Sequence, residues 1–357
     1  MHESFIIEGL ISEHFSCMIV KLIFLNRNDY YLKNKGFDDM KKIIVALLSV
    51  TVLLTACSTS DERSNDPSIS VYTTVYPLQY FTERIGGDVV TVDSIYPPGS
   101  DEHTFEPTQK DMMTLADADL FFYIGLGLEG FVDNAEKTLK NEHVKLVPTA
   151  QHIPDNLLIH SDDEHHDDEH EHNHHGHDHD HDHGDIDPHV WISPTLAQYL
   201  AEDIKKALQE ALPTEAQYFE DNFKQLTKEL AVLDEQFKQM AYAAKQKSFY
   251  VSHAAFGYIA VQYGLEQVAI AGLHSQSEPS QKELIDLVEK AKAENVQYVL
   301  FEQNISSKIT QTIQHEIGAQ SLSMHNLSVL TTADIKQKED YFSLMEQNVE
   351  TLKKALQ

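Results

Sequence analysis

From Ser68 onward, apolar and polar residues follow two patterns that succeed each other along the chain. Short runs rich in Val, Ile, Tyr and Phe are typical of buried strands. They alternate with longer segments in which apolar residues recur every three or four positions, as in amphipathic helices. The predicted strands are 69–75, 89–96, 119–126, 144–149, 248–253, 266–273, 296–302 and 319–325. Strands that alternate with helices predict mainly parallel sheets with helical crossovers, so the fold class is α/β.

The predicted helices are bounded by local start and stop signals. They cover 77–87, 108–118, 129–141, 195–212, 254–264, 279–295, 306–318 and 338–356. Two glycines end the first of them, as glycines commonly end helices. Pro279 stands near the start of the helix over 279–295, where Ser280 and Glu283 have the spacing of a capping box.

One segment, 213–246, has a helical pattern far longer than the others. Aromatic and aliphatic residues recur along it at three- and four-residue steps, and we interpret them as core packing: Tyr218, Phe219, Phe223, Leu226, Leu230, Leu233, Phe237 and Met240. A helix of about 30 residues is roughly 45 Å long. The chain is therefore predicted to form two similar lobes, 68–212 and 247–357, joined by this helix.

The charge of the chain limits its partners. Its 357 residues carry a formal net charge of −30, and twelve Asp and Glu with no Lys or Arg lie within 161–187. The remainder is acidic as well. Such a surface repels phosphate backbones and anionic lipid headgroups, which argues against nucleic-acid binding and favours cations.

A secretory signal begins inside the chain, at Met40. Lys41 and Lys42 precede a short apolar run that leads to Leu54-Thr55-Ala56-Cys57. We interpret 40–56 as a signal peptide of the bacterial lipoprotein type, Cys57 as its lipidated residue and 57–67 as a polar tether. The alternative is a membrane-spanning helix, but about a dozen apolar residues are short for a span that needs roughly 20.

Residues 1–39 do not fit a signal that must start near the N-terminus. We interpret them as the product of an upstream start codon; the alternative is a genuine extension, which would place the signal inside the chain. Of the two cysteines, Cys17 lies in this extension and Cys57 is the lipidation site. The mature chain is therefore expected to have no disulfide and no thiolate ligand, so a metal site must use His, Asp, Glu or water.

Ligand-type residues follow the predicted strands at four places. Ligands bind at the carboxyl ends of parallel strands. His103 follows one such strand, His253 and Glu302 each close another, and His189 precedes the helix over 195–212. One lobe would supply His103 and His189 and the other His253 and Glu302, a set that suits Zn²⁺. We interpret five other histidines as surface or loop residues: His143, His152, His274, His315 and His325.

A run rich in His and Asp, 160–187, precedes His189. Its histidines form a predicted accessory metal-collecting loop: His165, His166, His170, His172, His174, His175, His177, His179, His181 and His183. Without apolar anchors no single geometry is enforced, which favours several weak sites over one tight site. Capture should weaken below about pH 6, because imidazoles must be deprotonated to bind a metal. The loop would raise local zinc, sense zinc, or pass zinc to the cleft; the alternative is a solvated loop with incidental affinity.

Several motifs together resemble a known family. In order and spacing, VYTTVYPL, PPGSDEHTFEPT, DPHVWISP, VSHAAFGYIAVQYG, SEPS and LFEQNISSK are similar to the cluster A-I metal-binding lipoproteins of bacterial ABC importers, specifically their zinc-binding, ZnuA/AdcA-like group. The resemblance covers Ser68 to the C-terminus. It implies two pseudo-symmetric lobes, a rigid linking helix and a metal in the interlobe cleft. It places the family's three histidines on His103, His189 and His253 and its acidic ligand on Glu302.

The resemblance implies an extracytoplasmic, lipid-anchored protein that captures Zn²⁺ and delivers it to ABC permease and ATPase subunits. Manganese-type relatives typically carry a carboxylate where His253 stands, and harder Mn²⁺ prefers such ligands. Some zinc-binding relatives have a disulfide that this chain lacks. We expect a monomer with no enzymatic activity, because four protein ligands leave no position for an activated water. The alternatives are a manganese or iron carrier of the same fold, a zinc hydrolase, and a surface adhesin with structural zinc. Neither H-E-x-x-H nor G-x-S-x-G supports the hydrolase.

Overall fold

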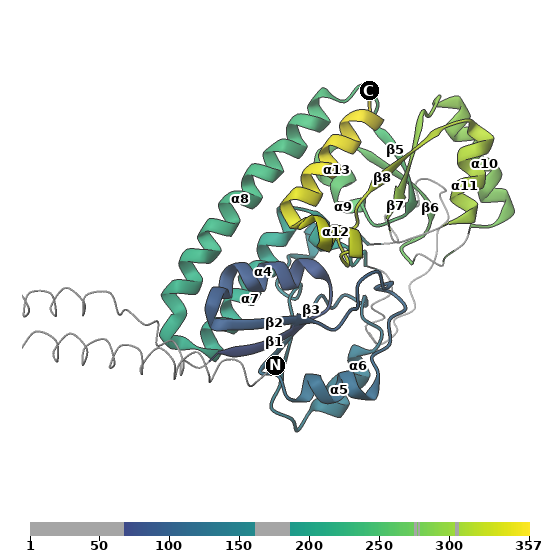
Figure 1. The fold of residues 1–357 in the computed structure, drawn as a ribbon. Coiled ribbons are helices and arrows are strands. Elements are labelled where there is room, and N and C mark those ends of the chain that lie inside the picture. The colour runs from purple at the N-terminus through teal and green to yellow at the C-terminus, as the bar shows by residue number, and fades with distance from the viewer. Residues whose placement is uncertain (1–67, 161–185, 275–276, 278, 304–306) are drawn as a thin grey trace, which may run out of the picture. The chain divides into compact units, whose positions relative to one another are not determined.

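The computed structural model describes residues 68–160, 186–274, 277, 279–303 and 307–357 (Figure 1). The predicted extension, signal peptide, lipidated Cys57 and tether all lie outside the described residues. So do the ten histidines of the accessory loop, from His165 to His183. Of the His/Asp-rich run, His160, Ile186 and Asp187 are described, and His160 pairs with Ile186 in an isolated antiparallel bridge.

The N-terminal lobe is built on a four-stranded parallel sheet in the order β2-β1-β3-β4. The strands are β1 (Ile69–Thr73), β2 (Val90–Ser94), β3 (Leu120–Tyr123) and β4 (Lys145–Pro148). The helices between them are α4 (Tyr76–Gly86), α5 (Gln109–Ala116) and α6 (Val132–Leu139). All four residues of β3 are buried, which explains its continuous apolar sequence.

The C-terminal lobe repeats this topology in the order β6-β5-β7-β8, again with parallel pairs. Its strands are β5 (Ser248–His253), β6 (Glu266–Ala271), β7 (Tyr298–Glu302) and β8 (Gln320–Met324). Its helices are α9 (Gly257–Tyr263), α10 (Gln281–Ala293), α11 (Lys308–Ile317), α12 (Thr332–Gln337) and α13 (Tyr341–Ala355). In both lobes the first strand lies between the second and the third, so the two α/β lobes are similar, as predicted.

The long helix is α8 (Ala216–Ala243), which follows the 3₁₀ turn η6 (Pro213–Glu215) and the helix α7 (Leu196–Ala211). It packs on α4 and α7 of the first lobe and on α13 of the second (Figure 1). The predicted apolar stripe is largely buried, although Tyr218 is exposed. Within the described residues, no helix is both long and apolar enough to cross a membrane.

One hydrophobic core extends through both lobes. The ring of Phe81 in α4 meets that of Tyr341 in α13 edge-on, with centroids 4.9 Å apart. The Tyr341 hydroxyl donates a hydrogen bond to the carbonyl of Trp191 at 3.0 Å, and the Trp191 side chain is fully buried. Because the lobes share packed side chains as well as α8, a large rigid-body opening would break part of the core.

Some helix ends agree with the predictions made from local sequence signals, whereas one helix was not predicted. The predicted capping box of Ser280 and Glu283 is present at the start of α10. The helix α12 was not predicted, although Thr331 and Asp334 form a capping box at its start. The first helix ends as expected: Gly87 has φ 55°, and a Cβ there would lie 2.1 Å from the Tyr218 hydroxyl. Only glycine fits that position without strain.

Candidate metal-binding site

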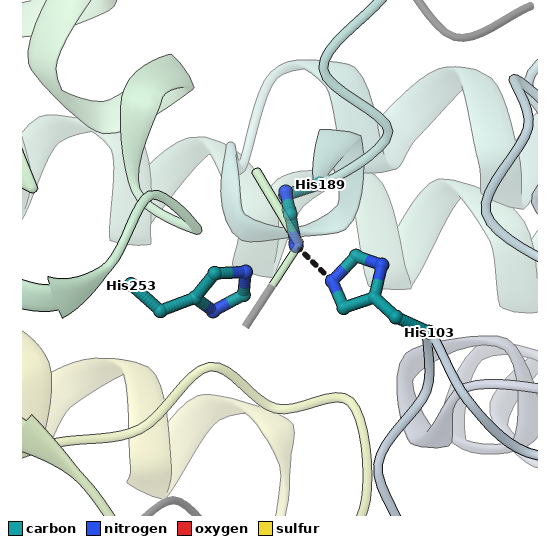
Figure 2. A group of neighbouring side chains, drawn as sticks. All are labelled: His103, His189 and His253. Atoms are coloured by element: carbon teal, nitrogen blue, oxygen red, sulfur yellow. Dashed lines mark hydrogen bonds between the residues drawn. The ribbon is translucent and has the colours of Figure 1, made fainter. Parts of the chain in front are cut away.

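Three histidines from distant parts of the sequence converge on one point (Figure 2). His103, His189 and His253 each offer a ring nitrogen, and these three atoms lie within 4.8 Å of one another. The ring centroids are 5.0 to 5.3 Å apart. His189 and His253 are fully buried and His103 is partly exposed. The structure therefore brings together three of the four residues proposed as ligands.

Each histidine is placed by the element that carries it. His253 is the last residue of β5, at the carboxyl edge of its sheet. His189 immediately precedes the 3₁₀ turn η5 (Val190–Ile192), whose apolar residues are completely buried. His103 lies in the loop after β2, where the Asp101 carboxylate accepts a hydrogen bond from the His103 backbone N–H at 3.0 Å. A strand end, a loop and a buried turn thus position the three histidines.

The His189 ring is oriented by a buried carboxylate. Oδ1 of Asp187 lies 2.8 Å from Nδ1 of His189 and also accepts from the His189 backbone N–H at 2.9 Å. A carboxylate accepts from Nδ1–H, so the Nε2 lone pair is left for a metal, an arrangement common around zinc-binding histidines. Asp187 is held in turn by Tyr258, whose hydroxyl donates to its backbone carbonyl at 2.6 Å. A Cβ at Gly257 would lie 2.8 Å from Asp187 Oδ2, so glycine leaves room for this carboxylate.

The two nitrogens of His253 both face acceptors. Nδ1 lies 3.2 Å from the Glu302 carboxylate, and Nε2 lies 2.8 Å from the carbonyl oxygen of Leu273. Burial alone would lower the pKa of His253, but the charge and hydrogen bond of Glu302 and the Leu273 carbonyl raise the pKa to about 9. The ring is therefore an imidazolium near neutral pH, and a metal must displace one of its protons.

His103 has the opposite protonation. Burial, together with the neighbouring rings of His189, His253 and His274, lowers the pKa of His103 to about 2. Its Nε2 lies 3.2 Å from Nε2 of His189, and its Nδ1 is buried with no hydrogen-bond partner among the described residues. A neutral imidazole with an unpartnered buried nitrogen suits the donor set of a borderline-soft cation such as Zn²⁺.

Glu302 contacts His253, but its oxygens are not among the converging ligand atoms. It is the buried last residue of β7. Its Oε1 accepts from the Ser252 hydroxyl at 3.2 Å, and its Oε2 accepts from Nδ2 of Asn326 at 2.7 Å. The carboxylate thus touches His253 and is held by two further donors, and its role as the fourth ligand stays a prediction.

The five histidines assigned to the surface or to loops differ in burial. His325 lies in the loop after β8, in agreement with that assignment, but its side chain is buried. Its Nε2 lies 3.2 Å from Asp334, and its Nδ1 accepts from the Leu327 backbone N–H at 2.8 Å. His274 is exposed as expected, yet its ring centroid lies 5.1 Å from that of His103. The remaining three are exposed: His143, His152 and His315.

Sequence reasoning also missed the polar residues that support the site. Glu102, beside His103, is almost fully buried, and burial raises the pKa of its carboxyl group. Asn326 donates to both Glu102 and Glu302. Asp187 and Glu102 stand within two residues of a predicted ligand, and that proximity was a usable signal. Asn326 had no such signal, because it lies 224 residues from Glu102.

A family model described as "ZnuA: Zinc-uptake complex component A periplasmic" matches residues 71–355. The chain belongs to this family. The match takes in every described strand except the first two residues of β1, and it includes all three converging histidines. The resemblance inferred from the motifs is thereby confirmed, and the family is one of solute-binding transport proteins.

Individual relatives agree with this placement. The chain is 37% identical to the zinc-binding lipoprotein AdcA of Streptococcus pneumoniae serotype 4 over 88% of its length, but it spans only 61% of that relative. It is 37% identical to the high-affinity zinc uptake system protein ZnuA of Bacillus subtilis, covering 85% of this chain and 94% of the relative. The Zn(II)-bound ZnuA-like domain of Streptococcus pneumoniae AdcA superposes with a TM-score of 0.66 at 32% identity, over 81% of this chain and 99% of that domain.

Proposed function

We propose that this protein is the extracytoplasmic solute-binding subunit of an ABC importer, which captures Zn²⁺ and delivers it to a membrane permease. The observation that carries the proposal is the convergence of His103, His189 and His253 from both lobes. The names of the relatives indicate a role in transport, and the set of donor atoms indicates which metal is carried. Imidazole nitrogens suit Zn²⁺ better than the harder Mn²⁺, which prefers carboxylates and water.

The fourth ligand in this proposal is Glu302. Its carboxylate is buried and lies 3.2 Å from Nδ1 of His253, one of the three converging histidines. Three imidazoles and one carboxylate complete a tetrahedral sphere. A filled sphere leaves no position for an activated water, so zinc is cargo here, and we propose that the protein has no enzymatic activity.

The proposed location follows from the predicted lipoprotein signal. Lipidation of Cys57 would anchor the protein to the outer face of the cell membrane, with 57–67 as a tether. The partners would be the permease and ATPase subunits of the same importer. Because α8 and the shared core join the lobes, zinc release would need a local rearrangement of ligand loops or of one lobe. Paired structures with and without zinc that showed closure as large as in hinged binding proteins would contradict this release mechanism.

We further propose that the His/Asp-rich run collects zinc near the entrance to the cleft. His160 and Ile186 pair with each other at its two ends. Deletion of 161–183 should reduce the total zinc bound and slow uptake while leaving one tight equivalent in place. If the tight equivalent were lost with the run, the assignment of the tight site to the three histidines would be wrong.

The experiment that tests the proposed function combines a structure with a titration. Anomalous scattering from zinc-soaked crystals should place one ion at His103, His189, His253 and Glu302. Competition titration should give tighter binding of Zn²⁺ than of Mn²⁺. The His189→Ala variant should lose the tight site, whereas His143→Ala, a matched change at an exposed histidine, should keep it. Tighter Mn²⁺ binding would favour the manganese carrier, and hydrolase activity that tracked bound zinc would favour an enzyme.

A further inference from the structure

The segment from His325 to Ser328, directly after β8, belongs to the C-terminal lobe. It is hydrogen-bonded to the N-terminal lobe close to the three histidines. The indole Nε1 of Trp191 donates to the Asn326 carbonyl at 2.7 Å, and the backbone N–H of Tyr76 donates to the Ser328 carbonyl at 2.8 Å. Both donors belong to the N-terminal lobe, whereas β8 belongs to the C-terminal lobe. On its own lobe the segment is fixed by Asn348, which makes two hydrogen bonds of 2.7 Å with the backbone of His325.

At the centre of this segment, the side-chain amide of Asn326 joins two buried carboxylates. Its Nδ2 donates to Oε2 of Glu302 at 2.7 Å and to Oε1 of Glu102 at 3.0 Å. The orientation of the amide is unambiguous, because the Ser328 backbone N–H donates to the opposite atom, Oδ1, at 3.1 Å. A backbone N–H cannot accept, so Oδ1 must be the oxygen. Both amide hydrogens therefore point at carboxylates.

The two carboxylates have different relations to the histidines. Glu302 touches His253, and Glu102 is the neighbour of His103 along the chain. Glu102 has a second donor, the Ser328 hydroxyl, at 2.9 Å from its Oε2. Both side chains are less than 5% exposed, so neither finds its hydrogen bonds in bulk water. A buried carboxylate needs such donors, and the loss of one is costly.

We propose that Asn326 is a positioning residue that sets the preference of this site for zinc. It holds Glu302 beside His253 as the single acidic ligand, and it keeps Glu102 engaged away from the metal. Without the amide, two carboxylates would be free to approach three imidazoles, which would give the site more oxygen donors and favour harder cations such as Mn²⁺. This inference rests on the proposed function, because it takes Glu302 as a zinc ligand.

The test measures Kd for Zn²⁺ and Mn²⁺ by competition on the full chain and on Asn326→Ala. Loss of a residue that orients a metal ligand typically weakens binding by about 10- to 100-fold, so zinc affinity should fall within that range. Manganese affinity should fall less or rise, so the ratio of the two Kd values should narrow by about tenfold, the lower end of that loss. Asn326→Ser, a milder change, should shift the ratio in the same direction and provides a second variant if the alanine variant does not fold.

The matched control is Asn348→Ala, which removes another buried asparagine that anchors the same segment but touches neither carboxylate. It should lower the melting temperature and leave the Zn²⁺/Mn²⁺ ratio unchanged. The double variant Glu102→Gln/Asn326→Ala should recover most of the ratio, because the competing carboxylate is gone. An unchanged ratio in Asn326→Ala, or an equal change in Asn348→Ala, would overturn the inference. If Glu302→Gln bound zinc with unchanged affinity, the proposed donor set would fail first, and the role given to Asn326 would fail with it.

Discussion

Zinc binding should displace a proton from His253. Both nitrogens of this ring face acceptors, the Glu302 carboxylate and the Leu273 carbonyl, which raise the pKa of His253 to about 9 despite its burial. At pH 7 almost every molecule therefore carries the imidazolium. A nitrogen must be unprotonated to bind a metal. We expect His253 to release about one proton per zinc bound at pH 7, and the apparent zinc affinity to rise about tenfold per pH unit between pH 7 and 9.

The same shift affects the protein without zinc. Because the folded-state pKa of His253 lies above the ordinary value of 6.5, the folded state binds more protons than the unfolded chain between these values. This contribution to stability is fully present below pH 6.5 and is lost as the pH rises through about 9. Zinc affinity and unliganded stability should therefore respond to pH in opposite directions over this interval.

Isothermal titration calorimetry in buffers of different ionisation enthalpy counts the released protons. Glu302→Gln is the informative variant, because removal of the carboxylate charge should lower the pKa of His253 and reduce its proton release well below one at pH 7. Protons released by the His/Asp-rich run cancel when the two proteins are compared. Equal proton release from both proteins, or an affinity of the unsubstituted protein that did not vary from pH 7 to 9, would refute the reasoning.

Two further predictions concern residues beside His189, and a third concerns a buried carboxyl group of the N-terminal lobe. Asp187→Asn should weaken zinc binding about 10- to 100-fold, because the His189 ring loses its carboxylate partner, and unchanged affinity in a competition titration would contradict this. Gly257→Ala should weaken binding less, since its Cβ would displace Asp187, and wild-type affinity would show that this carboxylate adjusts freely. Burial raises the pKa of Glu129 to about 7 from an ordinary 4.5, so stability should fall as the pH rises through this range. As the pH rises from 4.5 to about 7, the free energy of unfolding measured in urea should fall by on the order of 3 kcal/mol less in Glu129→Gln than in the unsubstituted protein. Parallel pH profiles of the two proteins would refute this.

Much of the fold could be predicted because its signals are local. The alternation of strand and helix patterns gave two parallel sheets of the same topology, and the apolar stripe of 213–246 gave α8. His253 and Glu302 close β5 and β7 as expected. Residues at strand ends share one edge of a parallel sheet, so the candidate ligands of a lobe could be named without knowledge of its tertiary contacts.

The contacts that orient those ligands were beyond local reasoning. Asn326 reads as an ordinary loop residue, since asparagine is common in loops, and nothing near it in sequence indicates a carboxylate partner 224 residues away. The burial of His325 was out of reach for the same reason, because it depends on contacts with Asp334 and Asn348 that no local pattern indicates. The family motifs indicated the candidate ligands, but they did not indicate the residues that orient those ligands.

The many histidines of 160–187 and the single predicted ligand His189 illustrate a related physical principle. A ligand binds tightly when its orientation is fixed before the metal arrives, because the entropy of ordering it has already been lost. His189 has a buried carboxylate on one nitrogen and a buried turn behind its backbone, and both restraints come from a core that extends through the two lobes. Asn326 provides the corresponding restraint for Glu302. If these two restraints determine zinc preference, relatives with the same ligands but different neighbours at these positions should differ in selectivity.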